Sequence, residues 1–295
     1  MPFKPVAGIP GIAFGTGSTW RSNPRPVRED GIAPAVVDTI KAAAEAGFRH
    51  FDGAENYRNE KSVGAGLKAT GIPRSELYIV SKVHPSLGKV EEEIKRQLDL
   101  FGVDYLDLYL IHTPKAASQA GISLLEAWKS LEALADQGVI KAIGVSNYGP
   151  DDFDAFLPSA RIKPIVNQIS IYPYIYHRQL PIIEYSERNG IAIEAYELSS
   201  SLLRDTEKGG PLDPVLNGIV ETLAKEGTSA TLGQVLLAWA AAKGWIPLTT
   251  SSKPSRLQEC IAAGDLALTP EQVAAIDAAG KEGAEKGYGQ YTSWK

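Results

Sequence analysis

The strongest constraint on the fold is a repeated junction in which a helix-like stretch ends at or near a glycine and a short apolar run follows. This junction occurs six times, around Gly47, Gly71, Gly102, Gly138, Gly190 and Gly244. Glycine suits the left-handed residue that closes a helix, so each junction predicts a helix followed by a strand. The opening run GIAFGTG and the run PIVNQIS bring the number of predicted strands to eight.

Amphipathic segments separate most of these strands, and they predict helices at 36–46, 61–69, 124–136, 214–225 and 270–279. Strands such as IAIEAY and YLDLYLI are largely apolar on both faces, as expected for parallel strands covered by helices. Regular β/α alternation without a linker predicts one α/β domain over residues 1–295, a (β/α)₈ TIM barrel. The segments 113–121 and 202–210 exceed simple connections, so long loops and an extra helix are expected at the carboxyl-terminal face.

Composition narrows the partners that this chain can have. The 295 residues carry a net charge of −5 without a basic stripe, which argues against nucleic-acid binding. The single cysteine, Cys260, excludes an internal disulfide framework and a cysteine-rich metal site. No apolar run of signal-peptide or membrane-spanning type is found, so we expect a soluble cytoplasmic protein, most simply a monomer.

Three sequence signals favour ordinary structural roles. The histidines have no close metal-ligand spacing, and no metal site is predicted from His50, His84, His112 and His177. The glycine pattern GAGLKA at 64–69 lies inside a predicted helix, where it does not form a dinucleotide-binding turn. The acidic run Glu91–Glu93 near a helix start favours the helix dipole and is expected on a solvated face.

Polar or ionisable residues gather at the predicted strand ends, at Asp52, Lys82, His112, Ser146, Asn147, Gln168 and Tyr196. In an α/β barrel these ends lie on one rim, where such enzymes carry their active sites. Each residue taken alone is equally well an ordinary strand-end polar group. That alternative does not readily explain why so many polar residues, whose side chains complement one another chemically, all fall at predicted strand ends.

The chemistry of this set suits carbonyl reduction. Tyr57, five residues after Asp52, is placed to protonate an oxygen that becomes negative as hydride reaches its carbon. The reference pKa of tyrosine is about 10, and a neighbouring Lys82 ammonium favours the tyrosinate. Asp52 then holds the lysine in place, and His112 orients the same oxygen by a hydrogen bond. The alternative is that Lys82 and Asp52 form a purely structural buried ion pair.

At these residues the chain resembles the aldo-keto reductase family, from GIPGIAFGTGSTW through SSKPSRLQE. The motifs that carry the resemblance are GFRHFDGAENYRNE, YIVSKV, DLYLIHTP, and GVSN with NQ. The segment TTSSKPSR resembles a fungal ketoreductase branch of the family. The resemblance implies reduction of aldehydes or ketones with a nicotinamide cofactor. It also implies a catalytic tetrad of Asp52, Tyr57, Lys82 and His112. NADPH is expected over NADH, because Arg256 and Lys253, with Ser251 and Thr250, offer a cluster of donors just past the eighth predicted strand. The alternative is that both basic residues are ordinary solvated charges at a helix start.

The resemblance extends to the cofactor and substrate residues. It implies that Ser146, Asn147 and Gln168 hold the nicotinamide amide and that Tyr196 stacks on the ring. Further cofactor contacts are implied at Thr19, Asp52, Ser199, Ser201, Thr250, Ser251, Lys253 and Arg256. Substrate contacts are expected from Trp20, Tyr57 and His112, with the segment 113–121 and the aromatic tail Tyr288, Tyr291 and Trp294 as further walls. The alternative for the tail is a disordered terminus.

The sequence departs from the family pattern near the cofactor. The pyrophosphate loop commonly reads Tyr-Ser-Pro-Leu, whereas this chain has Tyr196, Glu197, Leu198 and Ser199. Thr250 stands where relatives often have a lysine before a serine, and Cys260 replaces an adenine-contacting asparagine. Two other functions therefore stay open, an NAD-dependent alcohol or sugar dehydrogenase and a non-catalytic cofactor-sensing barrel.

Overall fold

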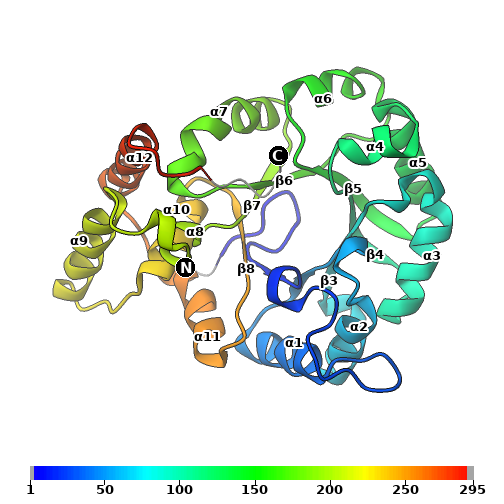
Figure 1. Ribbon diagram of the computed structural model, residues 1–295, viewed down its shortest axis with the longest axis horizontal. Coiled ribbons are helices and arrows are strands. Elements are labelled where there is room, and N and C mark those ends of the chain that lie inside the picture. Colours follow the sequence, from blue (N-terminus) through cyan, green and yellow to red (C-terminus); the bar gives the residue numbers. More distant parts are fainter. Residues whose placement is uncertain (1–2, 291–295) are drawn as a thin grey trace. The chain divides into compact units, whose positions relative to one another are not determined.

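The computed structural model describes residues 3–290, in which eight strands form a closed barrel in the order β1 to β8 (Figure 1). The strands are β1 (Ala13–Gly15), β2 (His50–Asp52), β3 (Tyr78–Val83), β4 (Leu106–Ile111), β5 (Ile140–Ser146), β6 (Val166–Ser170), β7 (Ala192–Tyr196) and β8 (Ile246–Thr249). Their pairing is parallel wherever a register is defined. The predicted (β/α)₈ barrel is confirmed, and the six junction glycines all have positive φ, between 68° and 116°.

The chain divides into two compact units. The first contains the chain up to Ile12, Gln168–Thr249 and the chain from Gln258 onward. The second contains Ala13–Asn167 and Thr250–Leu257. Each unit is described by itself.

The second unit holds β1 to β5 with a series of helices on the outside of the strands (Figure 1). These are α1 (Pro34–Ala46), α2 (Glu60–Ala69), α3 (Val90–Phe101), α4 (Lys115–Ala120), α5 (Leu124–Asp136) and α6 (Pro150–Asp154). Helix α4 corrects the expectation of a loop over 113–121. Its sequence KAASQA is rich in helix formers, and Gly121 ends it in the left-handed conformation.

The glycines of GAGLKA lie inside α2, as predicted, and serve helix packing. A Cβ on Gly64 would lie 2.4 Å from the carbonyl oxygen of Phe101 at the end of α3. A Cβ on Gly66 would lie 2.7 Å from the Cβ of Ile40 in α1. The two glycines therefore let α2 approach both neighbouring helices closely.

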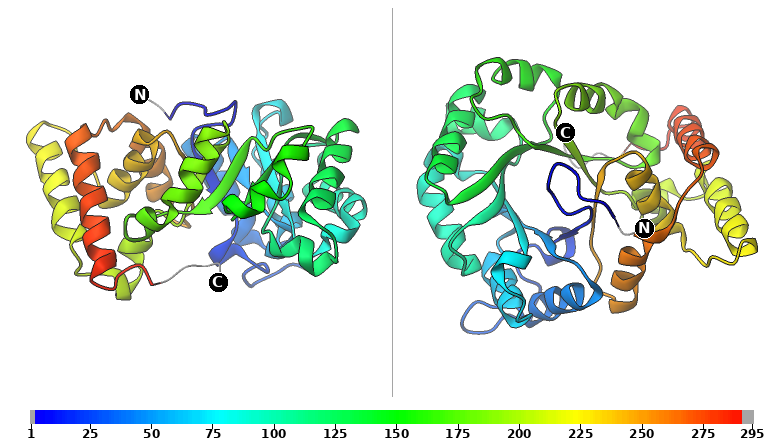
Figure 2. Two further views of the ribbon diagram at one scale, coloured as in Figure 1. Left: turned by 90° about the horizontal axis from the view of Figure 1, so that it is seen from above. Right: turned by 180° about the vertical axis from the view of Figure 1, so that it is seen from behind.

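The first unit holds β6 from Gln168 onward, β7 and β8. It also holds a second set of helices, α7 (Pro173–Arg188), α8 (Ser200–Leu203), α9 (Leu212–Lys225), α10 (Leu232–Ala242) and α12 (Pro270–Glu285). Helix α11 (Pro254–Ala262) begins in the second unit. Figure 2 shows α9 and α12 side by side. The core of this unit contains the mutually packed rings of Tyr176, Trp239 and Trp245.

Helix α12 extends beyond the predicted end at residue 279 and continues to Glu285. The extension contains Gly280 and Gly283, which are weak helix formers. A Cβ at either position would lie within 2.3 Å of an atom of Pro173 or Tyr174 in α7. Close packing of α12 on α7 therefore stabilises a helix that the sequence alone does not favour.

The chain after α12 is only partly described. Tyr288 packs against Tyr174, with 5.0 Å between the ring centroids. The predicted tail residues Tyr291 and Trp294 lie outside the described residues. No helix within residues 3–290 is long and apolar enough to cross a membrane.

Replacing Gly64 by alanine tests the close packing of α2. We expect Gly64→Ala to lower the free energy of unfolding by about 1–3 kcal/mol, because the added methyl group overlaps backbone atoms of Phe101. Gly218→Ala is the matched control, since nothing lies within 4 Å of a Cβ at this position in α9. It should raise stability by about 0.5–1 kcal/mol. Equal effects in urea unfolding would contradict the packing role of Gly64.

Candidate active site

Strand pairing makes polar residues of successive strands face the same way. Asp52 pairs with Val80, and Lys82 follows Val80 by two residues. Side chains two residues apart share a face of the sheet, so Asp52 and Lys82 project to the same side. The same two-residue step relates Lys82 to His112, because Lys82 pairs with Leu110. Leu110 pairs with Gly144, so Ser146 lies level with His112 on the next strand. The register therefore gathers these groups near the carboxyl ends of β2 to β5.

Lys82 and Asp52 form a buried ion pair. The Lys82 Nζ atom lies 2.6 Å and 2.7 Å from the two carboxylate oxygens of Asp52, and it donates a third hydrogen bond to the carbonyl oxygen of Gly53 at 2.8 Å. The exposed fractions of Lys82 and Asp52 are 0% and 1%. Three acceptors around one ammonium compensate the cost of removing these charges from water.

Tyr57 lies beside this pair, in the short 3₁₀ turn Glu55–Tyr57 that follows β2. Lys82 Nζ is 5.1 Å from the centroid of the Tyr57 ring, and the ring of His112 meets it edge-on at a centroid distance of 5.8 Å. A Cβ on Gly17 would lie 2.9 Å from Cζ of Tyr57. Gly17 is therefore the residue that admits the phenol at this position.

Opposing influences act on the proton of Tyr57. Burial raises the pKa of Tyr57 above its usual value, and the negative charge of Asp52 acts in the same direction. Lys82 opposes both, through its charge and through a hydrogen bond, and Arg21 adds a smaller lowering effect. The phenol is consequently protonated at neutral pH, and its nearest charged neighbour favours loss of the proton.

His112 directly follows β4 and is 2% exposed. Burial lowers the pKa of His112 well below its usual value, and the positive charge of Lys82 lowers it further. His112 is therefore a neutral imidazole at neutral pH. A neutral imidazole has one N–H group with which it can donate a hydrogen bond to a carbonyl oxygen.

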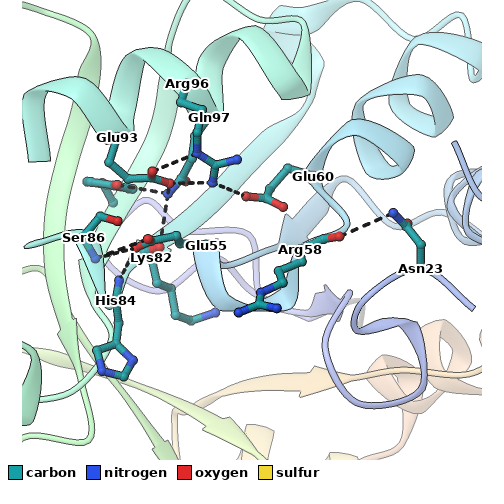
Figure 3. Close-up of polar contacts among 11 residues, drawn as sticks. Asn23, Glu55, Arg58, Glu60, Lys82, His84, Ser86, Glu93, Arg96 and Gln97 are labelled. Atoms are coloured by element: carbon teal, nitrogen blue, oxygen red, sulfur yellow. Dashed lines mark hydrogen bonds and ion pairs between the residues drawn. The ribbon is translucent and has the colours of Figure 1, made fainter. Parts of the chain in front are cut away.

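Glu55 fixes the chain that follows β3 (Figure 3). Its carboxylate accepts hydrogen bonds from the backbone N–H groups of His84, at 2.7 Å, and Ser86, at 3.2 Å. The ring of His84 in turn lies edge-on to His112, at a centroid distance of 6.2 Å. Glu55 thus ties the Tyr57 turn to the segment beyond Lys82.

Glu93 corrects one sequence prediction. Glu91 and Glu92 are exposed, as expected, but Glu93 is 6% exposed. Its carboxylate accepts hydrogen bonds from Arg96, at 2.7 Å and 2.8 Å, and from Gln97 at 2.7 Å (Figure 3). Arg96 and Gln97, one turn further along α3, supply these hydrogen bonds and compensate the burial of the carboxylate.

Trp20 is 6% exposed, and its indole N–H donates a hydrogen bond to the hydroxyl of Thr250 at 3.2 Å. Asn59 holds the same loop from the other side. Its side-chain amide donates to the carbonyl oxygens of Thr16 and Trp20, at 2.7 Å and 2.8 Å. The predicted substrate residue Trp20 is therefore fixed to a residue of the predicted cofactor segment.

Ser146 ends β5, and Asn147 follows it in the left-handed conformation, with φ of 62°. The Asn147 side-chain amide donates to the carbonyl oxygen of His112 at 3.1 Å and to the Ser146 hydroxyl at 2.9 Å. The predicted amide-binding pair is thereby joined to the backbone of His112.

Gln168 lies in the first unit, in the middle of β6 rather than at its end, because the strand continues to Ser170. Its Nε2 donates a hydrogen bond to the carboxylate of Glu194 in β7 at 2.7 Å. Tyr196 ends β7, as predicted.

The segment after β7 contains the residues that depart from the family pattern. Glu197 has a positive φ of 66° and accepts a hydrogen bond from the Ser170 hydroxyl at 2.7 Å. Arg204 donates to the other carboxylate oxygen at 3.1 Å. Ser199 precedes α8, and Ser201 is 1% exposed within it.

The basic residues after β8 lie where the sequence predicts, at the start of α11. Lys253 precedes the first helical residue and Arg256 lies in the first turn, and both are exposed. The Lys253 backbone N–H donates to the Ser251 hydroxyl at 3.1 Å. Thr19, the remaining predicted cofactor residue, is exposed in the short 3₁₀ turn after β1.

Sequence reasoning missed several residues that support the site. They are Gly17, Glu55, Asn59, Gln97 and Glu194. Glu194 had a visible signal, because it is the one charged residue in the otherwise apolar run IAIEAY. Within residues 3–290, no group of three or more histidine, cysteine, aspartate or glutamate side chains is arranged to hold a metal ion.

The fold and this cluster of side chains define a class of protein, a (β/α)₈ barrel with a buried lysine and aspartate pair beside a tyrosine and a histidine. The chain belongs to the aldo/keto reductase family, whose model matches residues 12–281. It is therefore a member of a family of oxidoreductases.

Individual relatives resemble this chain over most of its length. It is 38% identical to the NAD/NADP-dependent indole-3-acetaldehyde reductase of Schizosaccharomyces pombe, over 86% of this chain and 85% of the relative. It is 34% identical to the NADPH-dependent alpha-keto amide reductase of Saccharomyces cerevisiae, over 93% and 88%. The crystal structure of a Bombyx mori aldo-keto reductase in complex with NADP has a TM-score of 0.79 and 29% identity, over 93% and 90%.

The depressed pKa of His112 gives a prediction for stability. A group whose pKa is lowered by folding stabilises the folded state above its unfolded pKa, about 6.5 for histidine, and this stabilisation is lost as the pH falls. The wild-type protein should therefore lose up to about 1.4 kcal/mol per pH unit below about 6.5 more than His112→Gln. Denaturant unfolding of both proteins at several pH values measures the difference. Parallel losses would contradict a neutral, buried His112.

Proposed function

We propose that the protein reduces aldehydes or ketones to alcohols with NADPH, and that Tyr57 supplies the proton. The observation that carries the proposal is the position of Tyr57 beside both the Lys82 and Asp52 ion pair and the His112 ring. A phenol, an ammonium and a neutral imidazole around one point are the groups that carbonyl reduction requires.

The chain's own residues fit a nicotinamide dinucleotide. The hydroxyl of Ser201 is buried and has no hydrogen-bond partner within the described part of the chain, so a phosphate oxygen would provide an acceptor for it. When bound, the dinucleotide supplies or accepts a hydride at its nicotinamide ring. We propose phosphate contacts from Thr19, Ser199 and Ser201, and stacking of Tyr196 on the nicotinamide ring.

The nicotinamide amide is proposed to contact Ser146, Asn147 and Gln168. These residues combine a hydroxyl with two primary amides, which together donate to an amide oxygen and accept from an amide nitrogen. The Asn147 amide nitrogen already donates to Ser146 and to the His112 backbone, which supports an accepting role for its oxygen.

The tetrad acts on the substrate oxygen. Neutral His112 donates a hydrogen bond to the carbonyl oxygen and orients it, and the Tyr57 hydroxyl donates a second. As the oxygen gains negative charge, the phenolic proton moves from Tyr57 to it. Lys82 stabilises the resulting tyrosinate, and Asp52 keeps the ammonium in position. Trp20, held by Thr250, is proposed as a wall of the substrate site.

The preference for NADPH is proposed from the basic residues at the start of α11. Lys253 and Arg256 lie at a helix amino terminus, where positive side chains oppose the macrodipole and a phosphate would compensate them. With the hydroxyls of Thr250 and Ser251 they form a cluster of donors suited to a 2′-phosphate. One relative is named NADPH-dependent and another NAD/NADP-dependent, which is consistent with either preference.

Replacing Tyr57 tests the proton donor. We expect Tyr57→Phe to lower the turnover number by about 10²-fold or more, because general acid catalysis is lost. Its affinity for cofactor should stay near that of wild type, since the ring is retained. Tyr105→Phe is the control, because Tyr105 precedes β4 at the opposite end of the strand from His112. Oxidation of NADPH with a panel of aldehydes, ketones and diketones is the measurement.

The same assay separates the competing functions. A barrel that oxidises no cofactor with any carbonyl or alcohol, yet binds it, would be a cofactor sensor. Turnover mainly of alcohols or sugars with NAD⁺ would identify a dehydrogenase. Near wild-type turnover in Tyr57→Phe would reject Tyr57 as the donor while leaving the reaction class intact.

Arg256 tests the cofactor preference. We expect Arg256→Ala to raise the dissociation constant for NADPH by about tenfold or more, about 1.4 kcal/mol, with little change for NADH. Lys95→Ala removes the same charge from an exposed position in α3 and should change neither constant. Titration of protein fluorescence gives both constants. Equal losses for the two cofactors, or a wild-type preference for NADH, would contradict the role of Arg256.

A further inference from the structure

Glu194 is a charged residue in the interior of the first unit. It lies in the middle of β7 and is 0% exposed, and its strand neighbours Ile193 and Ala195 are buried apolar residues. Burying a carboxylate is costly unless hydrogen bonds compensate the loss of water. One such hydrogen bond comes from Gln168 of β6, whose Nε2 lies 2.7 Å from Glu194 Oε2.

This contact determines which way the Gln168 amide faces. A side-chain amide has a donating nitrogen and an accepting oxygen, and the two are nearly interchangeable in shape. An ionised carboxylate only accepts hydrogen bonds, so the nitrogen of Gln168 must face Glu194. Because nitrogen and oxygen diverge from the same carbon, Oε1 is then directed away from Glu194.

We propose that Glu194 is a positioning residue that makes Gln168 present its oxygen, as a hydrogen-bond acceptor, to the carboxamide nitrogen of the nicotinamide ring. The inference rests on the proposed function, in which Gln168 contacts this carboxamide. It adds a reason for the buried charge and a direction for the hydrogen bond. The site then binds a ring whose substituent carries N–H donors more tightly than a ring whose substituent carries only a carbonyl oxygen.

Three probes measure this discrimination without requiring turnover. They are NADP⁺, its 3-acetylpyridine analogue, which lacks the amide N–H groups, and 2′-phospho-ADP-ribose, which lacks the ring. For the wild-type protein we expect NADP⁺ to bind about tenfold more tightly than the acetylpyridine analogue, as one hydrogen bond in a buried site allows. Isothermal titration calorimetry gives the three dissociation constants.

Glu194→Gln is the central variant, because glutamine has nearly the shape of glutamate. Its amide can both donate and accept, so it no longer requires Gln168 to donate the hydrogen bond. In this variant the Gln168 amide can face either way, so the tenfold discrimination should fall to about twofold. Binding of 2′-phospho-ADP-ribose should stay within about twofold of wild type. Glu132→Gln is the matched control, since Glu132 is a buried carboxylate of α5 that accepts hydrogen bonds from the backbone of residues 161 and 162. It should leave the discrimination unchanged.

The exchanged pair Gln168→Glu with Glu194→Gln provides a rescue. The new carboxylate at position 168 accepts from the amide at position 194 through one oxygen and offers the other to the carboxamide. Discrimination should return to near tenfold. Thermal unfolding of each variant shows whether it is folded at the titration temperature.

The outcomes separate this inference from the proposed function. Wild-type discrimination in Glu194→Gln, equal weakening of all three probes, or absence of discrimination in the wild-type protein would overturn the role of Glu194. If Gln168→Ala binds NADP⁺ as tightly as the wild-type protein does, the proposed carboxamide contact itself fails. Weakened binding in Gln168→Ala together with unchanged discrimination in Glu194→Gln would reject Glu194 alone.

Discussion

The ion pair between Lys82 and Asp52 is the interaction on which the candidate active site depends. Both charges are buried, so each requires the other, and the Gly53 carbonyl oxygen accepts a further hydrogen bond from the ammonium. The pairing register of β2 with β3 brings the two side chains to one face. Because the pair is buried, its effect on Tyr57 is stronger than that of a similar pair in solvent.

The residues around this pair act by restricting backbone positions. Glu55 accepts hydrogen bonds from the chain beyond β3, and Asn59 holds the carbonyl oxygens of the loop after β1. Gly17 leaves room for the Tyr57 ring in that same loop. A site that must hold reacting groups within fractions of an ångström needs such supporting contacts as much as the reacting groups themselves.

The sequence predicts the features that depend on local patterns. Helix-ending glycines, apolar strands and polar strand ends are readable because each follows from backbone conformation or side-chain periodicity. Features that depend on contacts between distant segments are not readable. The extension of α12 through Gly283 requires the close approach of α7, and the burial of Glu93 requires its partners Arg96 and Gln97. Propensity and charge alone favour the opposite outcome at both places.

Glu197, which departs from the family pattern after β7, also has its charge compensated by nearby protein groups. Glu197 introduces a negative charge into a segment proposed to lie near phosphate, where an uncompensated carboxylate would repel the ligand. The Ser170 hydroxyl and the Arg204 guanidinium occupy its two oxygens, so the carboxylate is neutralised within the first unit. Its left-handed backbone turns the chain into α8, where the buried hydroxyl of Ser201 lies. The unusual residue is therefore compatible with a phosphate neighbour because its charge is already satisfied by protein partners.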